Sequence, residues 1–215
     1  MKNQKQESEI LNQFHKLGVK DVDLDGLSIM NQWKVLDAFQ QVAKDFPCIC
    51  GAVSFIKMAD SDQIDDDAEA TTVLSIIHGK RVIGIYLNAT FFTSPFFPLK
   101  LWYEKSTHFA AGKGIKGVVI HELGHVLHYL LDMNKYPYDN TLLVQQMNLQ
   151  TSTAKIVLQV QQKLHIEATQ IRYYLSIYGS SDSDEAIAEG ISEYYTTKEP
   201  RAFSTEIFLN MKNLL

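Results

Sequence analysis

Apolar residues recur at intervals of three and four along much of the chain, which is the spacing of one face of an α-helix. Serine caps and Gly or Pro stops at the ends of these stretches support the assignment near the N-terminus. After Tyr138 the helical pattern dominates the chain, and one long run ends at Gly179. The predicted helices cover residues 8–18, 28–47, 115–132, 154–178, 184–197 and 202–215.

Runs typical of β-strands occur in the first half of the chain, at residues 48–58, 72–78 and 81–88. Gly79-Lys80 separates the last two runs and predicts a hairpin. The pattern predicts an α+β protein with a small mixed sheet. We expect one domain, in which residues 1–132 form a sheet-containing lobe with a long helix and residues 133–215 form a mainly helical lobe.

Three other segments belong to neither pattern. Residues 21–25 are acidic and predict a turn, and residues 60–69 predict a solvated acidic loop. Residues 90–114 form a long segment rich in aromatic side chains. A loop of this length either shapes a pocket or packs on the core.

Composition excludes several classes of protein. The chain has 215 residues, 46% hydrophobic and 21% charged, which is ordinary for a soluble globular protein. A net charge of −5 leaves no basic footprint, so we expect no nucleic-acid partner. No apolar run reaches the ~20 residues of a membrane span, and Cys48 and Cys50 are too close in sequence to bridge.

The N-terminal residues carry no apolar signal core. We therefore expect a chain that is cytoplasmic, or that is secreted or delivered to a host by another route, or that has lost its signal. A monomer is favoured.

The segment Gly117–Tyr129 contains His121-Glu122-x-x-His125. Residues four apart lie on one face of a helix, so both histidines can bind one metal ion. Zn²⁺ suits such ligands, and Glu122 is placed to act as general base on a zinc-bound water. Gly124, inside the helix, predicts the close approach of another backbone. An apolar stripe on the opposite face comprises Val119, Leu123, Val126, Leu127 and Leu130.

A third histidine ligand is not evident. The three-histidine pattern would need His at position 131, where this chain has Leu131. His128 lies one turn beyond His125 and is interpreted as making a structural hydrogen bond. His165, within the predicted helix 154–178, is a weak candidate.

Carboxylates offer better candidates, because Glu185, Glu189 and Glu193 recur every four residues and line one helical face. One can bind zinc while the next hydrogen-bonds a ligand histidine. Alternatively, Asp182-x-x-Glu185 forms a capping box, and the other two are solvent-facing charges. Spacing alone does not decide which carboxylate touches the metal.

Two motifs resemble those of the glutamate-zincins, and in particular the group of the anthrax lethal factor catalytic domain and the Pro-Pro endopeptidases. They are His121-Glu122-x-x-His125 and Tyr178-Gly179, followed after five residues by Glu185-x-x-Ala188-Glu189. The resemblance covers residues 72–195. The connection from His125 to Glu185 spans 60 positions (185 − 125), longer than this group leads us to expect.

The resemblance implies a zincin-like fold and a zinc-dependent metalloendopeptidase acting on a protein or peptide. It implies that Glu185 is the third ligand, that Glu189 supports a ligand histidine, and that Tyr178 points at the scissile carbonyl. Without the resemblance, Tyr178 is the last core residue of its helix. The resemblance also suggests a bacterial toxin or effector protease.

Strand 81–88 precedes the metal helix, and an exposed strand edge binds extended peptides. We therefore expect Gly84, Ile85 and Tyr86 to contact a substrate running antiparallel to residues 83–87; the alternative is a plain core strand. The alternative function is a non-catalytic, zinc-stabilised protein-binding module, although such a module has no need of a base at Glu122.

Overall fold

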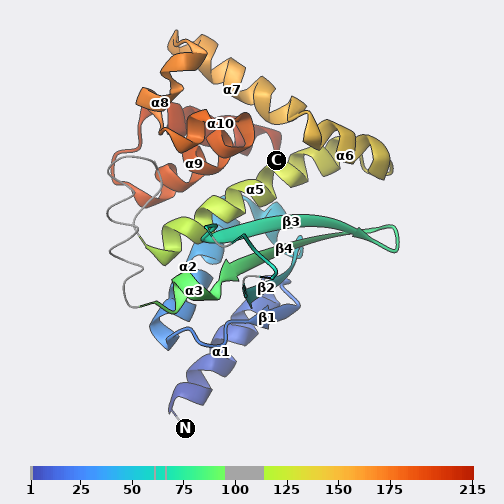
Figure 1. Ribbon diagram of the computed structural model, residues 1–215, viewed down its shortest axis with the longest axis vertical. Helices are drawn as coiled ribbons and strands as arrows, with labels where there is room; N and C mark the ends of the chain where they lie inside the picture. Colours follow the sequence, from blue (N-terminus) through green and yellow to red (C-terminus); the bar gives the residue numbers. More distant parts are fainter. Residues whose placement is uncertain (1, 61, 66, 95–113) are drawn as a thin grey trace.

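The structure is a computed structural model that describes residues 2–60, 62–65, 67–94 and 114–215 (Figure 1). It has the predicted α+β architecture, with a small mixed sheet and a larger helical part. The long helix α5 (Ile115–Lys135) runs between the sheet and the C-terminal helices in Figure 1. Most of the aromatic segment 90–114 lies outside the described residues. Within the described part of the chain, no helix is both long and apolar enough to cross a membrane.

The sheet consists of β1 (Asp21–Asp23), β2 (Val53–Ala59), β4 (Lys80–Asn88) and β3 (Ala70–Ile77), in that spatial order. β1, β2 and β4 are parallel, and β3 is an antiparallel strand at the edge. The predicted hairpin joins β3 to β4, but its turn is His78-Gly79 and not Gly79-Lys80, because Lys80 is already paired with Ile77. His78 and Gly79 in its turn both have positive φ, 50° and 76°, as in the type I′ turn that matches strand twist.

The helices predicted at 28–47, 115–132, 184–197 and 202–215 are present, whereas those at Ala89–Phe92 and Asn140–Asn148 were not predicted. In chain order the helices are α1 (Lys2–Lys16), α2 (Ile29–Asp45), α3 (Ala89–Phe92), α5, α6 (Asn140–Asn148), α7 (Thr151–Leu164), α8 (Ile171–Tyr174), α9 (Ser183–Thr196) and α10 (Ala202–Leu214). Short 3₁₀ turns are η1 (Pro47–Ile49), η2 (Ala168–Gln170) and η3 (Tyr178–Ser180).

Helix α5 is the centre of the packing. It contacts α9, α2 and the edge strand β3, and its predicted apolar stripe is buried. A Cβ added at Gly124 would lie 2.7 Å from the Cα of Ala188. The predicted close approach is therefore confirmed, and the backbone it admits is that of α9. One hydrophobic cluster extends from Ile10 in α1 to Met211 in α10.

The expected turn at residues 21–25 is wrong, because Asp21–Asp23 is a short strand paired in parallel with β2. The strand expected at 48–58 begins only at Val53, and Cys48 lies in η1. Helix α1 begins at Lys2 rather than near Ser8. Pairing partners in tertiary structure decide such boundaries more than local composition does.

The expected continuous helix 154–178 is also wrong. His165 adopts left-handed backbone angles (φ 56°) and ends α7 as its C-cap. The chain then continues through η2 and α8 to η3. The break brings Tyr178 to the N-terminal end of α9, as part of a short turn and not of a long helix.

Candidate metal centre

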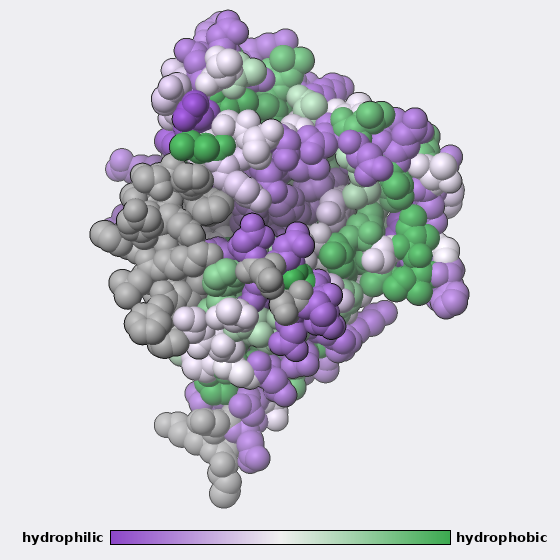
Figure 2. Space-filling view, in the orientation of Figure 1, coloured by the Kyte–Doolittle hydropathy of each residue, from purple (hydrophilic) through white to green (hydrophobic). Residues whose placement is uncertain are grey.

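Three side chains from two helices converge on one point. His121 and His125 lie one turn apart on α5, and Glu185 lies in the first turn of α9. One ligand atom from each of the three lies within 4.8 Å of the others. In Figure 2 a mainly hydrophilic recess lies between the sheet and the C-terminal helices on the face shown.

The distances within this group fit a tetrahedral ion. Nε2 of His121 lies 3.2 Å from Nε2 of His125 and 3.2 Å from Oε2 of Glu185. Nε2 of His125 lies 3.7 Å from the same carboxylate oxygen. Ligand atoms held about 2.0–2.1 Å from a tetrahedral zinc lie roughly 3.4 Å apart. The residues present therefore fit such an ion.

The surroundings of Glu185 Oε2 are a second observation that fits a bound cation. This oxygen is buried and makes no hydrogen bond to any described residue, although it lies near both imidazoles. Buried carboxylate oxygens are normally satisfied, and a cation between the three residues would satisfy this one. The predicted capping box does not occupy the carboxylate, because Asp182 caps α9 and the other Glu185 oxygen accepts from Tyr178.

The other ring nitrogen of His121 is held by Glu189. Oε1 of Glu189 lies 3.1 Å from His121 Nδ1, and Ser176 donates a 3.0 Å hydrogen bond to Oε2. Glu189 is fully buried. The alternative that Glu189 is a solvent-facing charge is therefore wrong. A carboxylate in this position fixes the tautomer and orientation of a histidine that binds a metal.

His125 has a different partner. Its Nδ1 lies 3.1 Å from Nε2 of His128, which is buried. The interpretation of His128 as a hydrogen-bonding residue agrees with this geometry. His165 caps α7 and is not among the converging residues.

Glu122 lies at the edge of the site and is held by a residue that sequence reasoning missed. Thr72 of β3 lies with its hydroxyl 2.7 Å from Oε2 of Glu122 and 3.0 Å from the backbone oxygen of Glu122. Tyr129 donates a 3.3 Å hydrogen bond to the carbonyl of Thr72. The contact joins residues 50 positions apart, so no local pattern signals it.

Tyr178 reaches the site from η3. Its hydroxyl donates a 3.1 Å hydrogen bond to Oε1 of Glu185, and its ring lies 6.0 Å from that of His121. About a third of its surface (36%) is exposed, so it is not a core residue. Its hydroxyl therefore lies beside Glu185, one of the three converging side chains.

Burial and neighbouring charges shift the pKa values of the groups in this site. Burial acts to lower the pKa of His121, but the carboxylates of Glu185 and Glu189 outweigh it and raise that pKa well above its ordinary value. Burial and the neighbouring His121 lower the pKa of His125. Burial raises the pKa of Glu122 above its ordinary value. Burial alone lowers the pKa of His128 to about 3.

The predicted substrate contacts do not lie where expected. Gly84, Ile85 and Tyr86 belong to β4, which pairs with β2 on one side and β3 on the other. Ile85 is fully buried, and the ring of Phe55 covers Gly84. The expectation of an exposed edge at β4 is therefore wrong, because the hairpin folds β3 over that edge.

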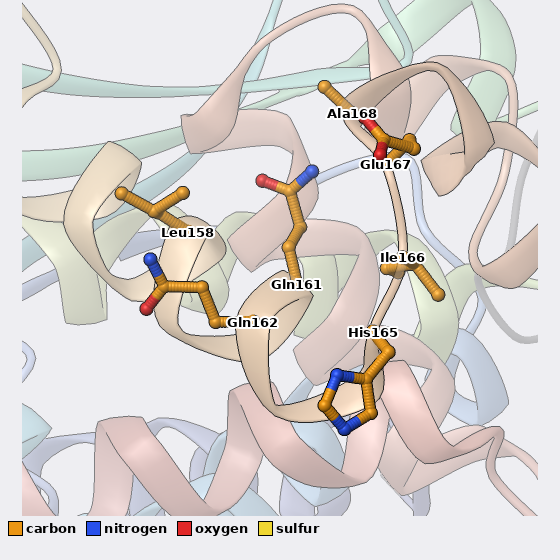
Figure 3. A pocket seen from close by; sticks show the side chains of 7 residues that line it. All are labelled: Leu158, Gln161, Gln162, His165, Ile166, Glu167 and Ala168. Carbon is orange, nitrogen blue, oxygen red and sulfur yellow. The ribbon is translucent and has the colours of Figure 1, made fainter.

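A separate hollow of about 630 Å³ lies at the C-terminal end of α7 (Figure 3). It shares no residue with the converging ligands. Its lining is Leu158, Gln161, Gln162, His165, Ile166, Glu167 and Ala168.

Comparison of the chain with protein-family models, with curated proteins and with solved structures finds no match. The resemblance to the glutamate-zincins thus rests on the residues of the two motifs.

Proposed function

We propose that this protein is a zinc-dependent metalloendopeptidase with the organisation of a glutamate-zincin. The observation that carries the proposal is the convergence of His121, His125 and Glu185 at zinc-like spacing, beside Glu122. A purely structural zinc site has four protein ligands, whereas a catalytic site has three and an open position. Among the described residues three donors converge, with Glu122 directly after His121 in the chain and the Tyr178 hydroxyl on Glu185, and this matches the second arrangement.

In this proposal the two histidines and Glu185 hold Zn²⁺. When bound, the ion supplies Lewis acidity and lowers the pKa of a water molecule. Glu122 takes the proton of the attacking water and returns it to the leaving amine. Thr72 occupies Oε2 of Glu122, which leaves Oε1 as the oxygen for this transfer. Tyr178 exchanges its hydrogen bond to Glu185 for one to the developing oxyanion, because a phenol has a single O–H to donate.

The edge strand β3 replaces β4 as the proposed wall for an extended substrate. Asn88 N donates to Glu69 O. In an antiparallel ladder, hydrogen-bonded pairs alternate with pairs that make no hydrogen bond to each other. Because Glu69 and Asn88 form a hydrogen-bonded pair, every second residue of β3 turns its backbone groups away from β4, toward the outer edge of the described sheet. These residues are Ala70, Thr72, Leu74 and Ile76. A peptide paired there would pass Thr72, which holds the base.

The test compares the parent protein with Glu122→Gln on a peptide library derived from a proteome, with cleavage sites identified by mass spectrometry. We expect both proteins to bind one equivalent of zinc and only the parent to cleave, with a loss of about 10²- to 10⁴-fold in the variant. Zinc binding without cleavage by either protein would instead favour a zinc-stabilised binding module.

The resemblance extends the proposal to a toxin or effector with one host target. Under that extension the parent leaves a bacterial peptide library intact and cleaves a single protein of a eukaryotic lysate. Cleavage of many bacterial peptides would contradict the extension but not the peptidase activity.

A further inference from the structure

The two histidines of the proposed metal centre differ in the group that holds them. The Nδ1 atom of His121 faces the buried carboxylate of Glu189 at 3.1 Å. The Nδ1 atom of His125 faces the imidazole of His128, also at 3.1 Å. The first partner is an anion, and the second is a ring on the same helix one turn further on.

The positions of the ring protons fix the direction of the hydrogen bond between His125 and His128. The Nε2 atoms of His121 and His125 face each other and Glu185. A histidine that binds a metal through Nε2 carries its remaining proton on Nδ1. His125 Nδ1 is then the donor, and Nε2 of His128 must be the acceptor. A neutral imidazole that accepts at Nε2 carries its own proton on Nδ1.

The surroundings of His128 are those of a neutral ring. Its exposed fraction is only 3%, and it packs against the rings of Tyr129 and His125 at centroid distances of 4.5 and 5.3 Å. No ion pair of His128 with a described carboxylate is present. Because a buried, unpaired charge is costly, the ring keeps one nitrogen free to accept.

We propose that His128 is a positioning residue that accepts a hydrogen bond from His125 and holds it in the tautomer and orientation required for zinc. This inference rests on the zinc site of the proposed function and deepens it. His128 is not itself a ligand, because its Nε2 is turned toward His125 and it does not belong to the converging group.

One consequence concerns the charge of the centre. Glu122, Glu185 and Glu189 already place three carboxyl groups around the two histidines. A carboxylate in place of His128 would add a fourth and weaken the Lewis acidity of the bound ion. A neutral acceptor orients His125 without adding that charge.

The test uses the metal-free, full-length protein and Zn²⁺ alone, in competition with a chromophoric chelator, so no substrate is needed. His128→Phe fills the site without an acceptor, and His128→Gln returns an acceptor near the position of Nε2. Leu127→Ala controls for loss of packing in α5, and His165→Gln controls for loss of a histidine outside the site. Circular dichroism reports the folded fraction of each protein.

We expect His128→Phe to weaken zinc binding about 10- to 100-fold, the usual effect of removing a partner of a ligand histidine. His128→Gln should stay within about threefold of the parent, because a neutral acceptor is retained. Both controls should bind zinc like the parent. In the ¹⁵N spectrum of the zinc-loaded parent, His128 should show a protonated Nδ1 and an unprotonated Nε2.

Each opposite result overturns the inference. These results are zinc binding by His128→Phe as tight as that of the parent, an equal loss of affinity in the Phe and Gln variants, or a proton on Nε2 of His128. Should the Phe variant fail to fold, the Gln variant and the parent spectrum still decide. A parent that binds no zinc would reject the proposed function as well, whereas tight binding by parent and Phe variant alike would reject the role of His128 alone.

Discussion

Helices α5 and α9 build the same site in different ways. On α5 the two proposed ligands, His121 and His125, stand one turn apart, and their Nε2 atoms face each other at the proposed metal position. On α9 three glutamates have the same four-residue spacing but three different environments. Glu185 faces the metal position, Glu189 holds His121, and Glu193 is buried against Arg201 and Ser204.

The difference shows that helical spacing specifies a shared face and not a shared role. Each of the three glutamates meets different neighbours, because each lies on a different turn of α9. Glu185 is partly exposed at 17%, whereas the side chains of Glu189 and Glu193 are at 0% and 5%. Burial therefore separates Glu185 from the other two, and the partner, His121 or Arg201 and Ser204, separates Glu189 from Glu193.

The largest expected effect comes from removing the ligand on α9. Glu185→Ala should weaken zinc binding by more than the roughly 100-fold upper range of outer-shell changes, because a ligand itself is lost. Chelator competition measures the affinity, and the exposed Glu199→Ala is the matched control. If Glu185→Ala keeps a full equivalent of zinc and Glu189→Ala loses it, the assignment of the third ligand is wrong.

Substitution of Glu189 should affect zinc affinity, whereas substitution of Glu193 should affect the stability of the fold. Glu189→Gln removes the charge beside His121 and should weaken zinc binding about 10- to 100-fold. Glu193→Gln should leave zinc affinity unchanged but lower the free energy of unfolding by about 1.5–3 kcal/mol, since charge-assisted bonds to Arg201 and Ser204 are lost. Urea denaturation measures the second effect. Equal zinc affinities for the two variants would contradict the separation.

His121 and His125, the two proposed ligands on α5, should differ in whether zinc binding displaces a proton from the ring. His121 has a raised pKa, so in the metal-free protein it holds a proton at pH 7, whereas His125 has a lowered pKa and is neutral. Binding should release about one proton at pH 7, and affinity should fall up to about tenfold per unit as pH falls. Calorimetry in buffers of different ionisation enthalpy counts the proton. No release at pH 7 would contradict this account.

The contact between the two helices can be tested at Gly124. Alanine in a helix interior normally stabilises by about 1 kcal/mol over glycine. Here the added Cβ would lie 2.7 Å from Ala188 Cα, so we expect Gly124→Ala to destabilise by about 1–3 kcal/mol. Separation of the helices should also weaken zinc binding. A more stable variant in thermal or urea unfolding would show that the helices can part freely.

The last expected effect concerns the rate alone, through the proposed general base Glu122. Thr72→Val keeps the shape of the side chain and removes the hydrogen bond to Glu122, worth about 1.5–3 kcal/mol to a charged group. We expect kcat to fall roughly tenfold or more on a peptide cleaved by the parent, with zinc affinity unchanged. Thr72→Ser should restore most of the rate. Equal losses for Val and Ser would indicate that packing, and not the hydroxyl, matters.

Much of this arrangement could be predicted because its causes are local. Helix periodicity located α5, α9 and α10 within a few residues, and Gly124 indicated a close neighbour. The hairpin at His78-Gly79 follows from turn chemistry. Where the helical pattern ran on without a stop, as across residues 154–178, the break at His165 was missed, because a left-handed cap on a histidine has no strong local signal.

The sequence by itself determined which groups are candidates for chemistry: two histidines and a glutamate at fixed spacing on one helix, and a row of carboxylates on another. Only the tertiary structure decided which carboxylate meets the histidines, which strand forms the free edge, and what holds each functional group. Thr72 and Glu122 are 50 positions apart, and His121 and Glu189 are 68 apart. Such contacts depend on how helices and strands pack, and periodicity carries no information about the depth at which each residue is buried.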